Sequence, residues 1–469
     1  MKRYGREGEK IMNDTRGRLG NFVKFSYGFA DVGFQMMVTL SNSYLLIFFT
    51  DVAGISAVTA GIIMTVGRII DTISVPILGP FIEKSHLPWG KYRSWLFIGA
   101  ICIFITNAIL FINLSFLPQA ALIAVGAIVY AVFCISTNVA YIGYTSMNSS
   151  LTDDPKEKVQ LSTFRGQGAA IGKIIAGWTL IPMIYFFGGA NAYTEQGFLV
   201  TAVFVGLMIV FTYLTLFFAT KDRKVMSSKE EIKDTKNNGP SVKDMLKQIV
   251  TTRPLLLLFL TDVTRILASL LVFSMFPYFF KYVVNDPAKV AVFFGSVNIL
   301  LFIGATLVPF ITKKLSKRTT YMCGNAVMAV CFVLMFLNSG NPTLVTILAS
   351  IGYLGYSLGN VVNTAMYADI VDFGEYRTGK NARAAIFSVF QLSIKVAAVF
   401  STSIAAFGLA STGFQAGVEP TAQVVSGINM ISMLLPAGLL LVGIVFLFFY
   451  NINEKELPEM REEMMNRKN

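Results

Sequence analysis

Apolar segments long enough to cross a lipid bilayer recur along the whole sequence, and they limit its possible folds more than any other feature. A membrane-spanning helix needs about 20 mostly apolar residues. About twelve such segments follow one another in 469 residues, of which 54% are hydrophobic and 14% are charged. We therefore predict an all-α membrane protein, with no segment left over for a soluble catalytic domain.

One long polar segment divides these helices into two sets of six. It covers residues 221–253, and we interpret it as a cytoplasmic linker between two bundles, 25–220 and 254–452, with tails at 1–24 and 453–469. The predicted helices lie near residues 25–50, 56–82, 94–113, 118–146, 161–188, 196–220, 254–280, 288–312, 320–338, 342–367, 384–410 and 422–452.

The distribution of basic residues predicts the orientation of the chain. A net charge of +12 could indicate a nucleic-acid partner, but Lys and Arg gather in alternate loops, as the positive-inside rule predicts. We therefore expect both termini in the cytoplasm, no nucleic-acid partner, and a multi-pass monomer in the cell membrane. The basic first 24 residues give no indication of a cleaved signal peptide.

Ionisable residues inside the apolar segments need a specific reason to be there. Insertion scales give a cost of roughly 2.5 to 3.5 kcal/mol for a charge at the bilayer centre, so such residues face a bundle interior, pair, or mark a transport path. Arg68 and Asp71 lie three residues apart on one helix face, and Asp262 and Arg265 repeat this spacing. Lys395 lies in the middle of a predicted helix with no acidic residue on its own face.

Polar residues in four predicted helices recur at spacings of three and four, which places each set on one helix face. Such stripes are typical of the wall of a water-accessible cavity, although amides and phenols also join helices by hydrogen bonds. Aromatic faces combined with amides favour a sugar as ligand. The stripes are Tyr27, Asp31, Gln35 and Asn42; Asn138, Tyr141 and Thr145; Tyr353, Tyr356, Asn360, Asn363 and Tyr367; and Ser388, Gln391 and Lys395.

The fifth predicted helix combines two cations with two small residues. Arg165 lies near one end of this helix and Lys173 lies deeper within it. Gly168 and Gly172 have the spacing that permits close approach of another helix, so we interpret them as packing positions.

Six segments in order resemble the glycoside-pentoside-hexuronide:cation symporter family, the melibiose-carrier branch of the major facilitator superfamily. The resemblance extends over nearly the whole chain. It implies a twelve-helix carrier with two six-helix halves that couples sugar uptake to Na⁺, Li⁺ or H⁺ by alternating access. The segments are residues 27–33 (YGFADVG), 68–76 (RIIDTISVP), 89–95 (WGKYRSW), 153–165 (DDPKEKVQLSTFR), 253–257 with 277–282 (RPLLL, PYFFKY) and 368–379 (ADIVDFGEYRTG).

The resemblance also implies roles for single residues. Asp71 matches the first of two carboxylates that bind the coupling cation in this family. Lys395 matches a lysine close to the cation and sugar sites, and Arg165 matches an arginine of the fifth helix. The acid that contacts sugar in the melibiose carrier falls at Gln35.

Several positions depart from the family pattern. Val75 replaces the second cation-binding carboxylate and Ser74 replaces its neighbouring amide. Asn138 replaces an acid of the fourth helix, and Ile142 replaces a tryptophan that stacks on sugar. Because Val75 removes both a charge and a ligand, we favour H⁺ over Na⁺ as the coupling cation, carried by Asp71.

These observations define the predicted site. We assign cation coupling to Asp71, Lys395 and Arg68. Four cysteines without paired spacing and a single histidine predict no metal site, and we expect no catalytic residue and no cofactor. The predicted substrate-binding residues are Asp31, Gln35, Asn138, Tyr141, Arg165, Tyr356, Asn360, Asn363, Gln391 and Lys395.

The function predicted from the sequence is proton-coupled import of a sugar or glycoside. Membrane-embedded cations exceed carboxylates by one, so a hexuronide or another anionic sugar is one candidate substrate and a neutral sugar is the other. The alternatives are a lipid or drug carrier on the same fold, and an uncoupled facilitator or exchanger. A membrane enzyme has the least support, because the loops contain no nucleophile with a base and no phosphate-binding glycine loop.

Overall fold

The part of the chain that the structure describes consists of helices and short connections. The computed structural model describes residues 19–85, 87–114, 116–152, 154–189, 193–221, 252–378 and 383–452, with scattered positions after 452. Twelve spans within these ranges are long and apolar enough to cross a membrane, which confirms the predicted all-α fold.

The spans follow the order expected from the apolar segments, and η marks a five-residue π-helical turn. In chain order they are α2 (Asn21–Ile47) with η1 (Phe48–Val52), α3 (Ala57–Lys84), α4 (Lys91–Leu110), α5 (Gln119–Leu151), α6 (Pro155–Gly188), α7 (Glu195–Ala219), α10 (Arg253–Tyr278) with η2 (Phe279–Val283), α11 (Lys289–Ile311), α12 (Lys317–Leu337), α13 (Pro342–Thr378), α14 (Arg383–Ser411), and α15 (Ala422–Asn429) with η3 (Met430–Leu434) and α16 (Leu435–Phe448).

Two helices extend well beyond their predicted ends. α13 continues to Thr378, whereas its apolar pattern ends at residue 367, and α6 begins at Pro155 rather than at 161. Backbone hydrogen bonding in a helix does not require apolar side chains, so a helix can continue where its polar residues find partners. Asp369, in the extension of α13, forms an ion pair with Lys317 at the start of α12.

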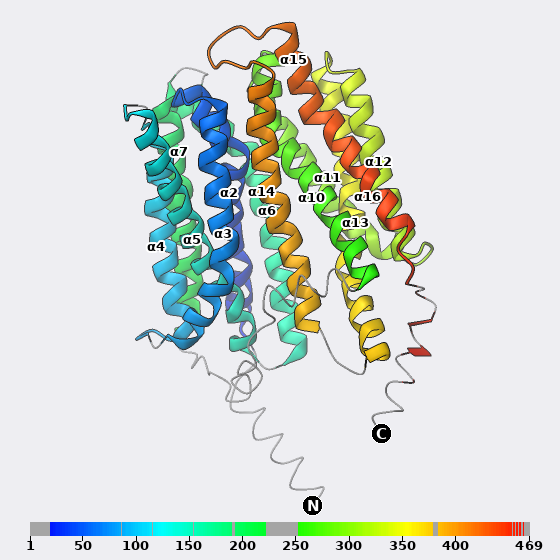
Figure 1. The fold of residues 1–469 in the computed structure, drawn as a ribbon. Coiled ribbons are helices and arrows are strands. Elements are labelled where there is room, and N and C mark those ends of the chain that lie inside the picture. Colours follow the sequence, from blue (N-terminus) through cyan, green and yellow to red (C-terminus); the bar gives the residue numbers. More distant parts are fainter. Residues whose placement is uncertain are drawn as a thin grey trace, which may run out of the picture.

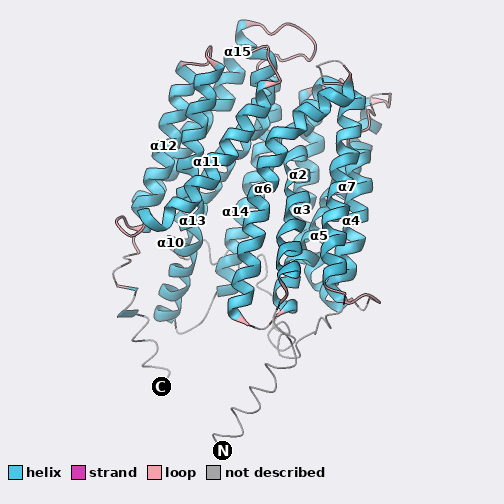
Figure 2. Ribbon diagram, turned by 180° about the vertical axis from the view of Figure 1, so that it is seen from behind, coloured by secondary structure: helices cyan, strands magenta, loops and turns pink. Residues whose placement is uncertain are grey.

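The helices pack as two groups, α2–α7 and α10–α16, which we call the first and second halves (Figure 1). The halves meet through three pairs of helices: α2 with α10, α3 with α14, and α6 with α11. Seen from behind, short loops join most consecutive helices within each half (Figure 2). The predicted linker falls almost entirely on residues 222–251 and the predicted N-terminal tail mostly on 1–18, which lie outside the described residues, as do most positions after 452.

Glycines allow the closest helix contact within the first half. A Cβ atom on Gly168 of α6 would lie 1.9 Å from the backbone oxygen of Gly28 in α2, and one on Gly172 would lie 2.6 Å from that of Val32. No side chain fits at either distance, so the two backbones touch directly. The packing role predicted for Gly168 and Gly172 is confirmed.

The two ends of the bundle are distinguished by the course of the chain. Twelve spans alternate in direction, so Asn21 at the start of α2 and Phe448 at the end of α16 lie at one end, which we call the terminal end. Several hydrogen bonds and ion pairs join the halves near the other end, which we call the opposite end. They are Asn42 with Ser274, Thr50 with Tyr278, Asp51 with Lys281 and Tyr282, and Thr65 with Ser403.

Candidate functional site

A carboxylate in the middle of α3 is bound by a lysine from the other half of the protein. The Lys395 Nζ atom of α14 lies 2.8 Å from both Oδ1 and Oδ2 of Asp71. The Asp71 side chain is 6% exposed, and that of Lys395 is 29% exposed. The lysine that has no acidic residue on its own helix therefore has its partner 324 residues away in sequence.

Asn138 of α5 holds this carboxylate from a third helix. Its amide nitrogen donates to Asp71 Oδ1 over 2.7 Å and to the Ser74 hydroxyl over 2.9 Å, while its amide oxygen lies 3.4 Å from Lys395 Nζ. The predicted substrate residue Asn138 is thus placed in direct contact with the predicted cation-coupling residues. An acid at this position would put a second negative charge beside Asp71, so the amide preserves the hydrogen bond without the repulsion.

Arg68 completes the cluster on the side of α2. Its Nη1 atom lies 3.9 Å from Asp71 Oδ2, and its Nη2 atom donates to the side-chain oxygen of Asn42. The backbone oxygen of Asn42 accepts in turn from Ser274 of α10. The cluster around Asp71 is therefore linked, through one residue of α2, to the contacts between halves near the opposite end.

Two cations share one carboxylate in this cluster. With Arg68, Lys395 and Asp71 all charged, the group carries a net positive charge in a low-dielectric interior, where the attraction between unlike charges is strong. Among the described residues, Asp71 is the carboxylate that forms an ion pair with Lys395, and this pair holds α14 against α3.

A second polar cluster lies between α2, α5 and α6 within the first half. Asp31 is 3% exposed, and its Oδ1 atom is buried with no hydrogen-bond partner among the described residues. Arg165 and Lys173 interact electrostatically with this carboxylate, and Gln35 interacts with it by a hydrogen bond. Tyr141 of α5 interacts with Arg165 as well, and its ring stacks on Phe34 with 4.8 Å between centroids.

Two residues predicted for the substrate site contact a buried ion pair of the second half. Asn363 donates to Asp262 Oδ1 over 3.0 Å, and the Tyr356 ring lies 4.5 Å from the guanidinium carbon of Arg265. Arg265 also donates to the Tyr321 hydroxyl over 2.8 Å, and that hydroxyl donates to Asp262. These side chains contact one another within α10, α12 and α13, while Asp262 Oδ2 and Arg265 Nη1 have no hydrogen-bond partner among the described residues.

The remaining predicted residues of the second half face open space. Asn360 of α13 and Gln391 of α14 are exposed, so either side chain can be reached by a solute or a lipid. The α13 stripe does not form one continuous cavity wall, because Tyr353 contacts Ser269 of α10 and Asn363 contacts Asp262 of the same helix. Residues on one polar face of α13 are thus buried where α10 packs against them and exposed where no helix does.

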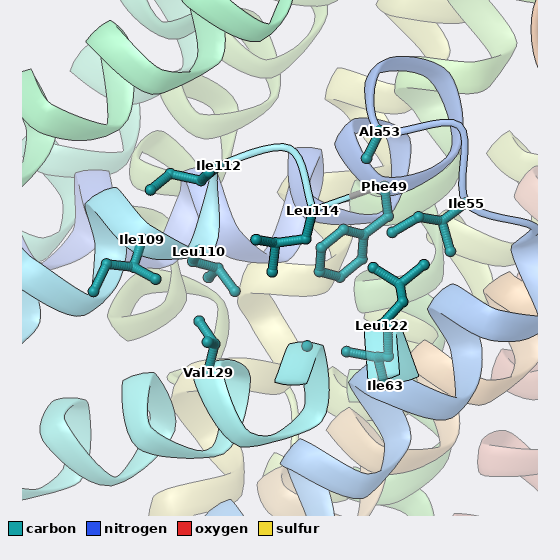
Figure 3. Close-up of a pocket in the computed structure, with 11 residues that line it drawn as sticks. Phe49, Ala53, Ile55, Ile63, Ile109, Leu110, Ile112, Leu114, Leu122 and Val129 are labelled. Atoms are coloured by element: carbon teal, nitrogen blue, oxygen red, sulfur yellow. The ribbon is translucent and has the colours of Figure 1, made fainter. Parts of the chain in front are cut away.

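A small pocket elsewhere in the first half is lined entirely by apolar residues (Figure 3). Phe49, Ile63, Leu110 and Leu122 are among its lining side chains. It offers no donor, acceptor or charge to a hydrophilic solute. The polar clusters around Asp71 and Asp31 are therefore the candidate site.

Sequence reasoning omitted several residues that the structure brings to these clusters. Ser74 binds Asn138, Asn42 binds Arg68, and Lys173 acts on Asp31. In the sequence, Ser74 is a departure from the family pattern, Asn42 is a stripe residue and Lys173 is a cation within a helix, but spacing along one helix predicts no partner for any of them. Asp51 and Lys281 lie near helix ends, where charges are common, so nothing in the sequence marked them as a pair.

Comparison with known proteins gives a consistent result. A family model described as MFS/sugar transport protein matches residues 26–454. An uncharacterized symporter of Bacillus subtilis (strain 168) is 28% identical over 96% of this chain and 96% of its own length. The isoprimeverose transporter of Lactiplantibacillus pentosus is 26% identical over 94% and 90%, and the glucuronide carrier protein homolog of Escherichia coli (strain K12) is 24% identical over 94% and 95%.

Solved structures match over the same extent. The crystal structure of a D-xylose–proton symporter superposes with a TM-score of 0.65 and 13% identity, covering 93% of this chain and 98% of that one. At this identity the match describes the fold alone.

Proposed function

The chain belongs to the MFS/sugar transport protein family, and from this premise we propose that it imports a sugar or glycoside by proton-coupled symport. The terminal end faces the cytoplasm of the cell membrane in this proposal, in agreement with the basic loops on that side. A solute enters from the opposite end, and the contacts that join the halves there close behind it.

Part of this assignment needs no further test. The family match and the named relatives confirm the resemblance to the glycoside-pentoside-hexuronide:cation symporter family over almost the whole chain. The chain is a multi-pass membrane transporter with the twelve-helix major facilitator fold, and it is not an enzyme.

One observation carries the proposed coupling: the Asp71 carboxylate of the first half holds Lys395 of the second half over 2.8 Å. A proton on Asp71 removes this attraction and frees α14 to move away from α3. Loss of the proton restores it. A group whose charge differentially stabilises one arrangement of the halves can couple proton movement to alternating access.

The contacts of Asp71 favour a proton over Na⁺. Both carboxylate oxygens already accept from Lys395, so a bound metal ion has to displace an ammonium group. Val75 offers no oxygen on the next turn of α3. A proton needs only one carboxylate oxygen and leaves the amide of Asn138 in place.

Transport assays in proteoliposomes that contain the reconstituted full-length protein test the proposal. We expect an inward proton gradient to drive accumulation of a pentose, a pentosyl disaccharide or a glucuronide from a panel of sugars. Asp71→Asn should abolish gradient-driven accumulation while counterflow of the same sugar continues, because the amide keeps the shape of the site without a titratable group. Asp286→Asn, which alters an exposed carboxylate, is the matched control and should accumulate sugar normally.

Three results contradict parts of the proposal. Unchanged proton-driven accumulation in Asp71→Asn removes Asp71 from the coupling step. Accumulation that requires a Na⁺ gradient at constant pH rejects the proton. Counterflow without accumulation under any gradient identifies an uncoupled facilitator or exchanger.

A further inference from the structure

Arg68 lies beside Asp71 but does not bind it closely. Its Nη1 atom is 3.9 Å from Asp71 Oδ2, beyond hydrogen-bond distance, although their spacing of three places both side chains on one helix face. Lys395, from the other half, lies 2.8 Å from both carboxylate oxygens. A guanidinium binds a carboxylate best through two parallel hydrogen bonds, so the distance between Arg68 and Asp71 needs a cause.

The amide of Asn42 in α2 is one such cause. The Nη2 atom of Arg68 donates to the side-chain oxygen of Asn42. The α2 backbone is fixed at this level, because the backbone oxygen of Asn42 accepts from Ser274 of α10 over 3.1 Å. The guanidinium is therefore held on the side of α2.

The ring of Tyr130 in α5 is a second cause. The guanidinium carbon of Arg68 lies 5.7 Å from the centre of this ring, within the range of a cation–π interaction. Gly67 lets the ring approach α3, since a Cβ atom there would lie 2.1 Å from Tyr130 Cδ1. Tyr130 is fully buried and its hydroxyl has no hydrogen-bond partner among the described residues, so the ring is the part that acts on Arg68.

The pair with the same spacing in α10 is arranged differently. Arg265 Nη2 donates to Asp262 Oδ1 over 3.4 Å, and the Tyr321 hydroxyl accepts from Arg265 and donates to Asp262. This tyrosine joins its arginine to the carboxylate, and among the described residues no lysine is paired with Asp262. An arginine that binds the neighbouring carboxylate closely thus forms an ion pair within one half.

We propose that Asn42 and Tyr130 are positioning residues of the coupling site, which hold Arg68 back from Asp71 and so leave the carboxylate to Lys395. This role rests on the proposed coupling through Asp71. Opposite charges attract strongly over a few ångströms in a low-dielectric interior. Without the amide and the ring, Arg68 closes on Asp71 and competes with Lys395, and the contact between α3 and α14 weakens.

Disulfide cross-linking between α3 and α14 measures this contact directly. The hydroxyl oxygens of Thr65 and Ser403 lie 2.8 Å apart. Cysteines at both positions, in an otherwise cysteine-free background, should therefore form a disulfide when the two helices meet. We expect Asn42→Leu and Tyr130→Leu to slow its formation several-fold in membranes, as Lys395→Gln should.

Conservative variants separate positioning from a loss of packing. Asn42→Asp keeps the acceptor oxygen and Tyr130→Phe keeps the ring, so both should cross-link at a rate close to that of the wild type. Ser136→Ala is the matched control on α5, because the Ser136 hydroxyl donates to Val132 of its own helix. Asn42→Ser replaces Asn42→Leu if that variant does not fold, since the serine oxygen stays closer to the backbone than Arg68 requires.

Unchanged cross-linking in both Asn42→Leu and Tyr130→Leu overturns the inference, as does equal slowing in their conservative counterparts. An unchanged rate in Lys395→Gln also overturns it, because the ion pair then does not hold the helices together.

Transport by the same variants separates this role from the proposed function. The two leucine variants should lose proton-driven accumulation several-fold and keep counterflow. A wild type without proton-driven accumulation contradicts the proposed coupling, whereas the cross-linking rates still decide whether Asn42 and Tyr130 position Arg68.

Discussion

Two helices of this protein carry the same local pattern, an aspartate and an arginine three residues apart, and the structure uses the two pairs differently. Arg68 and Asp71 of α3 lie where the two halves meet, with Lys395 of the other half bound to the carboxylate. Asp262 and Arg265 of α10 are enclosed by residues of their own half.

Exposure separates the two pairs as clearly as their partners do. The side chains of Asp262 and Arg265 are 0% and 1% exposed, whereas Lys395, which holds Asp71, is 29% exposed. Water can therefore reach the Asp71–Lys395 pair, whereas it reaches the Asp262–Arg265 pair only if the bundle opens. An ion pair acts as a switch when its partner belongs to a moving body and its charge can change; otherwise it fixes one packing arrangement.

The largest expected effect is the loss of protein stability when the enclosed Asp262–Arg265 pair is broken. Asp262→Asn leaves Arg265 buried without a counter-charge, which typically costs about 3–5 kcal/mol. We expect a marked fall in the unfolding temperature of the detergent-solubilised protein, measured by intrinsic fluorescence, and poor yield. Asp71→Asn should lower that temperature much less, because Lys395 can turn towards water.

The comparison fails if the two variants exchange behaviour. Asp262→Asn that is as stable as the wild type but loses gradient-driven uptake would make the enclosed pair part of the coupling machinery. The double variant Asp262→Asn with Arg265→Gln should recover part of the stability, since no unpaired charge then remains.

A second prediction concerns Lys395 itself. Lys395→Gln leaves Asp71 with Arg68 and Asn138 but without a charged contact to the second half. We expect proton-driven accumulation in proteoliposomes to fall at least tenfold while thermal stability stays close to that of the wild type. Wild-type accumulation by this variant would show that the contact between α3 and α14 plays no part in coupling.

The smallest expected effect concerns a pair between the halves at the opposite end. Lys281 of η2 binds Asp51 of η1, and Tyr282 donates to the same carboxylate oxygen. The Asp51 side chain is 0% exposed, but that of Lys281 is 28% exposed. Because partly exposed ion pairs stabilise little, Lys281→Gln should increase the population open at this end only a few-fold.

Cysteine labelling measures this shift. Thr65→Cys, placed where α3 meets Ser403 of α14, should react a few times faster with a membrane-impermeant maleimide when Lys281→Gln is added in a cysteine-free background. Lys289→Gln, at the neighbouring exposed pair with Asp286, should leave the rate unchanged. An equal rate in both variants would exclude the Asp51–Lys281 pair from closure.

The sequence alone determined the twelve spans, the all-α class and the family resemblance, and it identified Asp71, Lys395 and Arg165 as unusual. These features depend on local properties, because hydropathy and helical hydrogen bonds involve residues within a few positions of one another. A motif match likewise needs only the order of residues along the chain.

Only the tertiary structure decided which charges meet. It placed Lys395 on Asp71, Asn138 between them, and Asn363 with Asp262 rather than in a cavity. Such partners lie tens to hundreds of residues apart, and periodicity specifies which face of a helix a residue occupies but not which other helix covers that face or at what depth.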